Sequence, residues 1–313
     1  MSASLALAAI GVAILVLGPR LVDAGWTAQA PRLAILAWQA LTFTAVATFV
    51  LAGVTLLIPI TTLAGGLGRV FHACAESVAN AYGSAEFPSG ALVGILLAGL
   101  MPLWVLSCVT WELVSGWLRW RELHRSIDMV AEPDRGLGVL VVDASAPAAF
   151  CVPGRTSRIV VTTGTLDALS HDELRGVLAH EAAHLRARHN LAVTMSQALV
   201  RAFPRVRLFR AASAQTRQLI ELLADDAAAA SVDRVSVASA IVSLAEMRAP
   251  AAAMAMAQEG AVLRVSRLLQ PLTPIDPWRH RLLAGGLWGV LLTPVLIAGL
   301  PTLSAALSDL CNI

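Results

Sequence analysis

The chain of 313 residues contains no lysine, a single tyrosine and only 14% charged residues. Its 23 basic residues are all arginines, they nearly balance 21 acidic residues, and the formal net charge is +2. Because no long basic run is present, the sequence gives no case for a nucleic-acid surface. It also contains no glycine-rich phosphate-binding motif. We therefore expect no nucleic-acid partner and no nucleotide cofactor.

Cysteine is scarce as well, and none of it follows a C-x-x-C spacing. The four cysteines, at positions 74, 108, 151 and 311, are scattered along the chain, which argues against a cysteine-based metal site. A structural disulfide is compatible only with Cys74 and Cys311, the two cysteines that the topology below places outside the cell.

Apolar residues dominate instead: they make up 57% of the chain, and its mean hydropathy is +0.70. Four stretches are almost free of charge, at 4–18, 33–60, 91–111 and 282–306. The last three are long enough to cross a hydrocarbon core of ~30 Å, and the first is marginal. The first stretch could also be a cleaved signal peptide, but it lacks a basic residue before the apolar run, which favours a retained helix.

The arginines that flank these stretches predict a topology. They occur between the first and second stretches, after the third and before the fourth, at positions 20, 32, 119, 121, 125, 279 and 281. The positive-inside rule then places residues 117–281 in the cytoplasm. We expect three regions: spans one to three in 1–116 with an extracytoplasmic loop at 61–90, a cytoplasmic domain in 117–281, and the fourth span with a short tail in 282–313.

One pentapeptide carries most of the chemical information: His180-Glu181-Ala-Ala-His184. On a helix, positions i and i+4 share a face, so the two imidazoles can hold one Zn²⁺. Glu181 points to the side of this pair, where it can act as a base toward a water on the metal. The sequence therefore predicts one zinc ion per chain, with His180 and His184 as ligands and Glu181 as the catalytic base.

A third protein ligand is needed, and Glu221 is the best candidate. Glu221 and Asp225 are again i and i+4 on a helix, so Asp225 can orient a ligand histidine while Glu221 binds the metal. The alternative is a solvated acidic face on an alanine-rich helix. His171 and His189 would lie about 180° from the site on a continuous helix and are poor ligands.

The segment around the pentapeptide reads as a compact α+β domain. Three strands are predicted at 137–143, 148–152 and 158–163, before a helix that begins at His171 behind the S-x-x-E capping box of Ser170 and Glu173. Further helices are predicted at 191–202, 211–230, 235–247 and 258–269. The alanine- and methionine-rich stretch 249–257 is expected to form a loop or lid.

Four segments, at 159–164, 169–174, 177–184 and 221–225, resemble the integral-membrane gluzincin metallopeptidases. Three spans before the catalytic domain and one after it resemble the BlaR/MecR-type antirepressor peptidases, and the nearest rival is the CAAX-prenyl-protease and HtpX type. The resemblance implies an α-helical membrane protein of about four transmembrane helices. A cytoplasmic α+β zincin-like metallopeptidase domain would then be inserted between the third and fourth.

The same resemblance implies the ligands His180, His184 and Glu221, the base Glu181 and the supporting Asp225. It also implies that segment 148–152 pairs with the substrate as the edge of the sheet. BlaR-type sensors carry a large extracytoplasmic penicillin-binding domain after the fourth span, whereas this sequence ends at Ile313. We therefore expect any external signal to act through the 61–90 loop, the spans, a sensor partner or a homo-oligomer.

The expected function is zinc-dependent cleavage of a protein substrate on the cytoplasmic side, with a repressor or a damaged membrane protein as substrate. The tetrahedral oxyanion needs support, for which Arg217 and His189 are candidates. Each has a simpler interpretation, Arg217 as an i,i+4 partner of Glu221 and His189 as a cation at a helix C-terminus. A metal sensor or transporter and a catalytically silent scaffold remain as alternatives.

Overall fold

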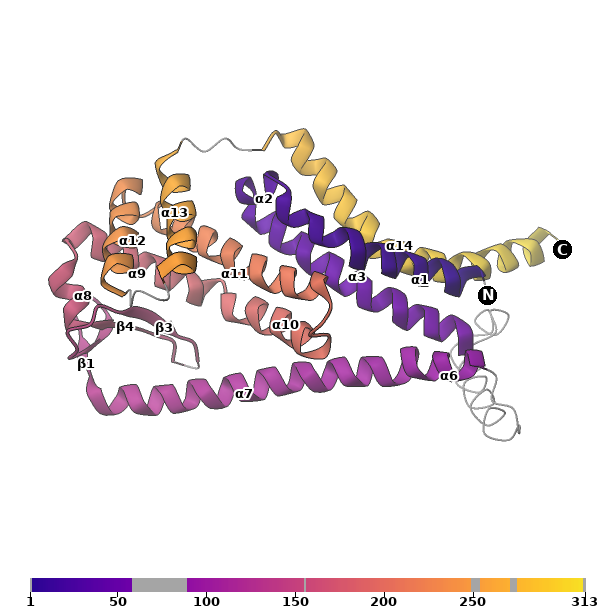
Figure 1. Cartoon of the computed structure of the whole chain (residues 1–313), viewed down its shortest axis with the longest axis horizontal. Helices are drawn as coiled ribbons and strands as arrows, with labels where there is room; N and C mark the ends of the chain where they lie inside the picture. The colour runs from indigo at the N-terminus through magenta and orange to yellow at the C-terminus, as the bar shows by residue number, and fades with distance from the viewer. Residues whose placement is uncertain (1, 58–88, 155, 249–253, 271–274, 312–313) are drawn as a thin grey trace.

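The computed structural model describes residues 2–57, 89–154, 156–248, 254–270 and 275–311, mostly as helices with one small sheet (Figure 1). The first part contains α1 (Ser2–Leu17), the 3₁₀ helix η1 (Gly18–Asp23), α2 (Trp26–Gln29), α3 (Pro31–Leu57), α6 (Ser89–Ile95), the π-helix η2 (Leu96–Leu100) and α7 (Met101–Val130). The second part contains β1 (Ala131–Asp134), β2 (Val139–Val142), β3 (Ala149–Val152), β4 (Arg158–Thr162), α8 (Thr163–Ala168), α9 (His171–Arg186), α10 (His189–Ala202), α11 (Arg207–Ala228), α12 (Arg234–Arg248), α13 (Met254–Leu269) and α14 (Pro277–Cys311).

Four helical segments of the described chain are long and apolar enough to cross a membrane: Ala3–Val22, Pro31–Leu57, Gly90–Val130 and Pro277–Gly299. They coincide with the four apolar stretches of the sequence. The third helical segment is much longer than the predicted span at 91–111, because α7 continues without a break to Val130. Its second half runs alongside the sheet and the helices of the second part (Figure 1).

Two close contacts join the spans to one another. A Cβ atom on Gly53 of α3 would lie 2.7 Å from the backbone nitrogen of Ala98, so only glycine permits this approach of α3 to η2. Thr44 of α3 donates a hydrogen bond from Oγ1 to the carbonyl oxygen of Val290 in α14, at 3.4 Å. The second predicted span thus packs against both the third and the fourth.

The spans share a hydrophobic core with the second part of the chain. Leu208, Leu219 and Leu222 of α11 are almost fully buried and pack with Ala34 and Trp38 at the beginning of α3. Burial of such large side chains stabilises a fold by roughly 1.5–3 kcal/mol each. The helix that carries Glu221 is therefore fixed directly to a membrane span.

A second contact of this kind lies on the third span. Trp104 of α7 donates a hydrogen bond from Nε1 to the carbonyl oxygen of Ala202, the last residue of α10, at 3.1 Å. Trp104 falls within the predicted span 91–111, while Ala202 falls within the predicted cytoplasmic region. The two regions are therefore packed together over part of α7, and position 116 does not separate them in space.

The sheet has the strand order β1-β2-β4-β3, with β2 and β4 parallel and the other two pairs antiparallel. The three predicted strands are confirmed as β2, β3 and β4, although β2 is shorter than expected. The first strand, β1, was not predicted because its sequence Ala-Glu-Pro-Asp has no apolar alternation. Gly164, just after β4, packs so closely on Ser145 that a Cβ atom would lie 2.1 Å from its carbonyl oxygen.

The predicted helices of the second part are present, and three of them begin two to four residues earlier than expected. Of the predicted loop or lid at 249–257, residues 249–253 lie outside the described residues, and 254–257 belong to the first turn of α13. Most of the 61–90 loop also lies outside them, as do Cys74 and the side chain of Cys311 that were considered for a disulfide.

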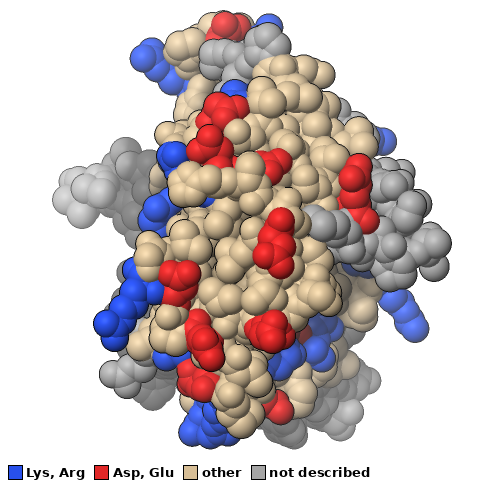
Figure 2. Space-filling view, turned by 90° about the vertical axis from the view of Figure 1, so that its left-hand side faces the viewer, with Lys and Arg blue, Asp and Glu red and all other residues tan. Residues whose placement is uncertain are grey.

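The two ends of the molecule differ in polarity. Large apolar side chains of α1, α7 and α14 are exposed, among them Leu5, Leu103 and Leu296 at more than 60% of their surface. Figure 2 looks onto the opposite end, where the sheet and α8, α9 and α12 lie, and shows acidic side chains spread over that face with arginines at its margins. This distribution fits an apolar helical part in lipid and a polar part in water.

Candidate metal centre

Helix α9 holds the pentapeptide in a fixed orientation. The capping box is present as predicted: Ser170 accepts a hydrogen bond from the backbone nitrogen of Glu173, and the Glu173 carboxylate accepts one from the backbone nitrogen of Ser170. Leu174 and Val177 on one face of the helix are buried against the sheet residue Val161. Helix α9 also packs against α11, the helix that carries Glu221.

His180, His184 and Glu221 come together in the described structure, each offering one ligand atom, and these atoms all lie within 4.8 Å of one another. The two Nε2 atoms are 3.1 Å apart. Glu221 Oε2 lies 3.5 Å from Nε2 of His180, and Oε1 lies 3.6 Å from Nε2 of His184. This is the arrangement that the sequence predicted for the three ligands.

The spacing of these atoms fits a zinc ion. Tetrahedral ligands at bond lengths of about 2.0–2.1 Å are separated from each other by about 3.3 Å. The observed separations of 3.1, 3.5 and 3.6 Å bracket this value. Two neutral imidazoles and one carboxylate are also a donor set that zinc accepts, and three protein ligands leave a fourth position for a water or a substrate.

Asp225 contacts the ring nitrogen of His180 that faces away from the other two candidate ligands. Its Oδ1 lies 3.0 Å from Nδ1 of His180, and its side chain is 1% exposed. Burial alone would lower the pKa of His180, but the hydrogen bonds to Asp225 and Glu221 outweigh burial and raise that pKa to about 9. Burial and the neighbouring charge on His180 lower the pKa of His184 to about 4. The positive charge of the pair is therefore favoured on His180, and metal binding would require this ring to be neutral.

The sequence did not predict the role of Arg264 on α13. Its Nε and Nη2 donate to the two carboxylate oxygens of Asp225 at 2.7 and 2.6 Å, and its Nη1 lies 3.1 Å from Oε2 of Glu221. A buried Asp225 needs a partner of opposite charge, and this bidentate contact supplies it. Among the described residues the arginine that pairs with Glu221 is therefore Arg264, and not Arg217 as one interpretation of the sequence had it.

His189 lies closer to the centre than the sequence suggested. Helix α9 ends at Arg186, and Arg188 adopts the left-handed backbone conformation with φ of 50°. Helix α10 therefore starts at His189 and folds back, so that Nδ1 of His189 lies 3.2 Å from Nδ1 of His184. The assumption of a continuous helix was wrong, and so was the interpretation of His189 as a cation at a helix C-terminus.

Glu181, the predicted base, lies near the thiol of Cys151 on β3, close enough for the two groups to shift each other's pKa. Burial raises the pKa of Glu181, an effect partly offset by the charge on His180. Burial, and then the charge of Glu181, raise the pKa of the Cys151 thiol to about 12. The sheet thus brings its edge strand into contact with the predicted base.

A cavity of about 810 Å³ opens between α7, α10 and α11. Its lining includes His184 and Glu221 of the candidate centre, Cys151 of β3 and Arg217 of α11. One of its walls is α7, where Glu112 forms an ion pair with Arg201 at 2.6 Å. A polypeptide that reaches the candidate metal centre through this cavity therefore passes along α7, where this helix continues beyond the third span.

The model of peptidase family M48 matches residues 115–280, slightly more than half of the chain and all of the candidate centre. The chain belongs to peptidase family M48. It is therefore related to metallopeptidases, as the resemblance implied, and family M48 enzymes use zinc.

Three curated relatives carry the name Protease HtpX homolog. The protein of Acidiphilium cryptum is 45% identical over 64 residues, which cover 20% of this chain and 22% of the relative. The proteins of Persephonella marina and Ralstonia nicotianae are each 44% identical, over 69 and 61 residues that cover 20% and 18% of this chain and 24% and 21% of the relatives. The chain thus matches less than a quarter of the length of each relative, and no solved structure matches it.

The sequence left two types open, BlaR/MecR and HtpX. The family match and the names of these relatives agree with the HtpX type at least as well as with the BlaR/MecR type. Four apolar helices and relatives of this kind make the chain a multi-pass membrane protein.

Proposed function

We propose that the protein is a zinc endopeptidase that hydrolyses peptide bonds of protein substrates at the cytoplasmic face of the membrane. The observation that carries the proposal is the convergence of His180, His184 and Glu221 at separations that suit one tetrahedral zinc ion. Family membership and the neighbouring carboxylate of Glu181 support hydrolysis over simple metal binding.

Zinc, when bound, supplies a Lewis acid that polarises the scissile carbonyl and acidifies a water molecule. The carboxylate of Glu181 takes a proton from the attacking water and delivers it to the leaving amide nitrogen. Burial of Glu181 raises its pKa, which brings this carboxylate closer to the proton affinity that such a shuttle needs. Asp225 holds the ring of His180, and His189 holds the ring of His184, in fixed orientations.

For the oxyanion we propose Arg217, because it lines the same cavity as His184 and Glu221 and is exposed to that cavity. His189 is better suited to orienting His184, since its Nδ1 already faces that ring.

We propose further that the substrate pairs with β3 as an additional strand. β3 lies at the end of the sheet, and Cys151 of this strand contacts the predicted base Glu181.

The cytoplasmic orientation rests on the arginines that flank the spans. The loop between the first two spans and the start of α14 lie on the side of the spans that faces the metal centre (Figure 1), as the charge distribution requires. A test is labelling of an Asp233→Cys variant, exposed near the start of α12. With Cys74 and Cys311 replaced by Ser, a membrane-impermeant maleimide is expected to label position 233 only after the cells are permeabilised, and labelling of this position in intact cells would contradict the orientation.

For the physiological role, the relatives favour degradation of damaged membrane proteins in the manner of HtpX-type proteases. A second role, cleavage of a repressor in a signalling pathway, is supported by the arrangement of three spans before the domain and one after it. Protein-level comparison of cells with wild-type and Glu181→Gln protein would separate the two roles. Accumulation of many membrane proteins in the variant supports the first, and accumulation of one cytosolic regulator supports the second.

The experiment that tests the proposed activity is cleavage of an unfolded casein-type substrate in detergent. Wild-type protein is expected to cleave it, and Glu181→Gln is expected to be slower by about 10²–10⁴. Equal cleavage by both proteins would exclude Glu181 as the base. Zinc binding without cleavage of any substrate would favour a metal sensor.

A further inference from the structure

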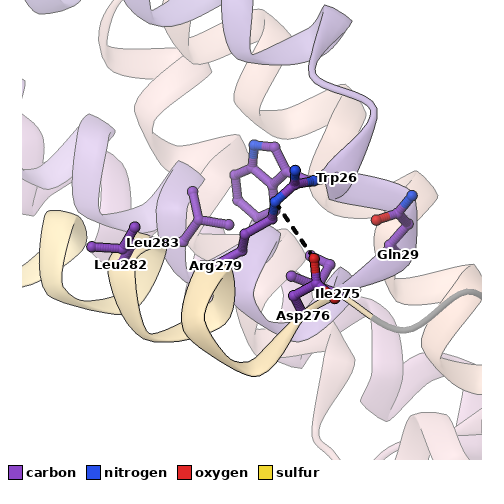
Figure 3. A pocket seen from close by; sticks show the side chains of 7 residues that line it. All are labelled: Trp26, Gln29, Ile275, Asp276, Arg279, Leu282 and Leu283. Atoms are coloured by element: carbon purple, nitrogen blue, oxygen red, sulfur yellow. Dashed lines mark ion pairs between the residues drawn. The ribbon is translucent and has the colours of Figure 1, made fainter.

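A second cavity, of about 450 Å³, lies far along the chain from the metal centre, between α2 and the beginning of α14 (Figure 3). Helix α2 contributes an indole and an amide, and the segment before and within α14 contributes an acid, an arginine and two leucines. These residues are Trp26, Gln29, Asp276, Arg279, Leu282 and Leu283. Neither the family match nor the proposed peptidase activity assigns a role to this cavity.

Its position is at the membrane boundary. Helix α2 connects the first span to the second, and α14 is the fourth, so the cavity lies where three spans end on the same side. Leu282 and Leu283 line the cavity about one turn further into the fourth span than Arg279, and Leu282 is 64% exposed. Trp278, also exposed, is of the kind that anchors helices at the headgroup level. The cavity therefore has a polar end in the headgroup region and an apolar end toward the acyl chains.

The polar end carries one charge of each sign. Nε of Arg279 lies 3.7 Å from Oδ2 of Asp276, which is longer than a hydrogen bond, and both side chains are about 60% exposed. Figure 3 shows this pair, with Arg279 extending from α14 toward Trp26 of α2. A loose, exposed pair of this kind is weak and leaves donors and acceptors for a ligand.

We propose that this cavity binds the headgroup of a zwitterionic phospholipid that carries a phosphate and a primary ammonium group. The guanidinium of Arg279, at the N-terminal end of α14, binds the phosphate. The carboxylate of Asp276 accepts hydrogen bonds from the ammonium, whose charge also favours the face of the Trp26 indole. An anionic headgroup without an amine would leave Asp276 opposite a negative charge, so the charge pattern selects the zwitterion.

The wall formed by α2 is connected to the helix that supports the metal centre. Arg267 of α13 donates from Nε to the carbonyl oxygen of Ala28 in α2, at 3.0 Å, and forms a bidentate ion pair with Asp226 of α11. Changes in the cavity can therefore alter catalysis indirectly. For this reason the test measures bound lipid, which does not depend on the proposed peptidase activity.

The experiment is native mass spectrometry of the purified full-length protein, after incubation with equal amounts of phosphatidylethanolamine and phosphatidylglycerol in detergent. Wild-type protein is expected to retain phosphatidylethanolamine in at least tenfold excess over phosphatidylglycerol. Asp276→Asn is expected to lose this preference, and Arg279→Gln to lose most of the bound phospholipid. Arg281→Gln is the matched control, because Arg281 is exposed on the same helix and is absent from the cavity lining.

Three results would overturn the proposal. Retention of both lipids in equal amounts by wild type would show that Asp276 selects nothing. An equal loss in Arg281→Gln and Arg279→Gln would show only general charge attraction to the membrane. Displacement of the lipid by millimolar soluble phosphoethanolamine would show that the ligand is a soluble headgroup and not a lipid.

Discussion

The guanidinium of Arg264 donates two hydrogen bonds, of 2.7 and 2.6 Å, to the carboxylate of Asp225, which lies 39 residues earlier in the sequence. The same guanidinium reaches Glu221 at 3.1 Å. One side chain of α13 thus fixes both the third candidate ligand and the acid that orients His180. The zinc affinity of the centre should therefore depend on a residue that does not touch the metal.

We predict that Arg264→Gln lowers zinc affinity by about 10–100-fold, because Glu221 and Asp225 lose their common partner. Competition with a chromogenic chelator measures this change. Arg267→Gln is the matched control: Arg267 lies one turn further along α13 and pairs with Asp226 instead of the centre. An equal loss of zinc affinity in both variants would mean that α13 acts only as a structural support.

His189→Ala is expected to weaken zinc binding about tenfold, because Nδ1 of His184 loses its neighbour at 3.2 Å. His189→Asn, which keeps a polar group in place, should restore part of this affinity. His171→Ala, at the exposed first position of α9, serves as a control. If His189→Ala instead lowered kcat and left zinc affinity unchanged, His189 would be an oxyanion residue.

Cys151 should resist alkylation in the folded protein. Since burial and the charge of Glu181 raise the pKa of this thiol from 9.0 to about 12, the reactive thiolate at pH 8 falls about a thousandfold. Iodoacetamide labelling followed by peptide mapping measures the rate at this cysteine alone. Labelling should be faster in Glu181→Gln, and a wild-type rate equal to that of the unfolded chain would refute the contact.

The capping box should make stability depend on pH in a defined direction. Hydrogen bonds from Ser239 and from the backbone of Ser170 lower the pKa of Glu173 below its ordinary value of 4.5. The stabilisation is therefore fully present above pH 4.5 and is lost as the pH falls through the lower, folded pKa.

Glu173→Gln keeps a hydrogen-bond acceptor but loses the charge of a largely exposed carboxylate, so it is expected to reduce the free energy of unfolding by only about 0.5 kcal/mol at pH 7, and by less at acidic pH. Thermal unfolding in detergent at several pH values measures this difference. Glu246→Gln, on the exposed side of α12, provides a reference for the loss of a carboxylate. A penalty for Glu173→Gln that did not shrink with falling pH would rule out ionisation as its cause.

Local patterns in the sequence predicted much of this structure. The capping box of Ser170 and Glu173, the four apolar stretches and three of the four strands depend on residues close together in the chain, and the structure contains them. The i,i+4 pairs His180–His184 and Glu221–Asp225 could be recognised for the same reason, and their helices bring them together.

The remaining features depend on contacts or backbone conformations that such patterns do not contain. The left-handed conformation of Arg188 is unusual for a residue other than glycine, so the reversal that brings His189 back was not foreseeable. Arg264 follows a low-complexity stretch, and nothing local connects it with Asp225. Only a chemical argument could have pointed to Arg264: an aspartate that is buried beside a metal centre requires a basic partner.

The most direct test of the account is the zinc content of detergent-purified protein, measured together with casein cleavage for wild type, Glu181→Gln and Glu221→Gln. We expect about one zinc per chain in wild type and in Glu181→Gln, with cleavage by wild type only. Glu221→Gln should lose most of its zinc and its activity, since a ligand carboxylate is removed. Wild-type protein without zinc, or Glu221→Gln with full zinc content, would contradict the assignment of the centre.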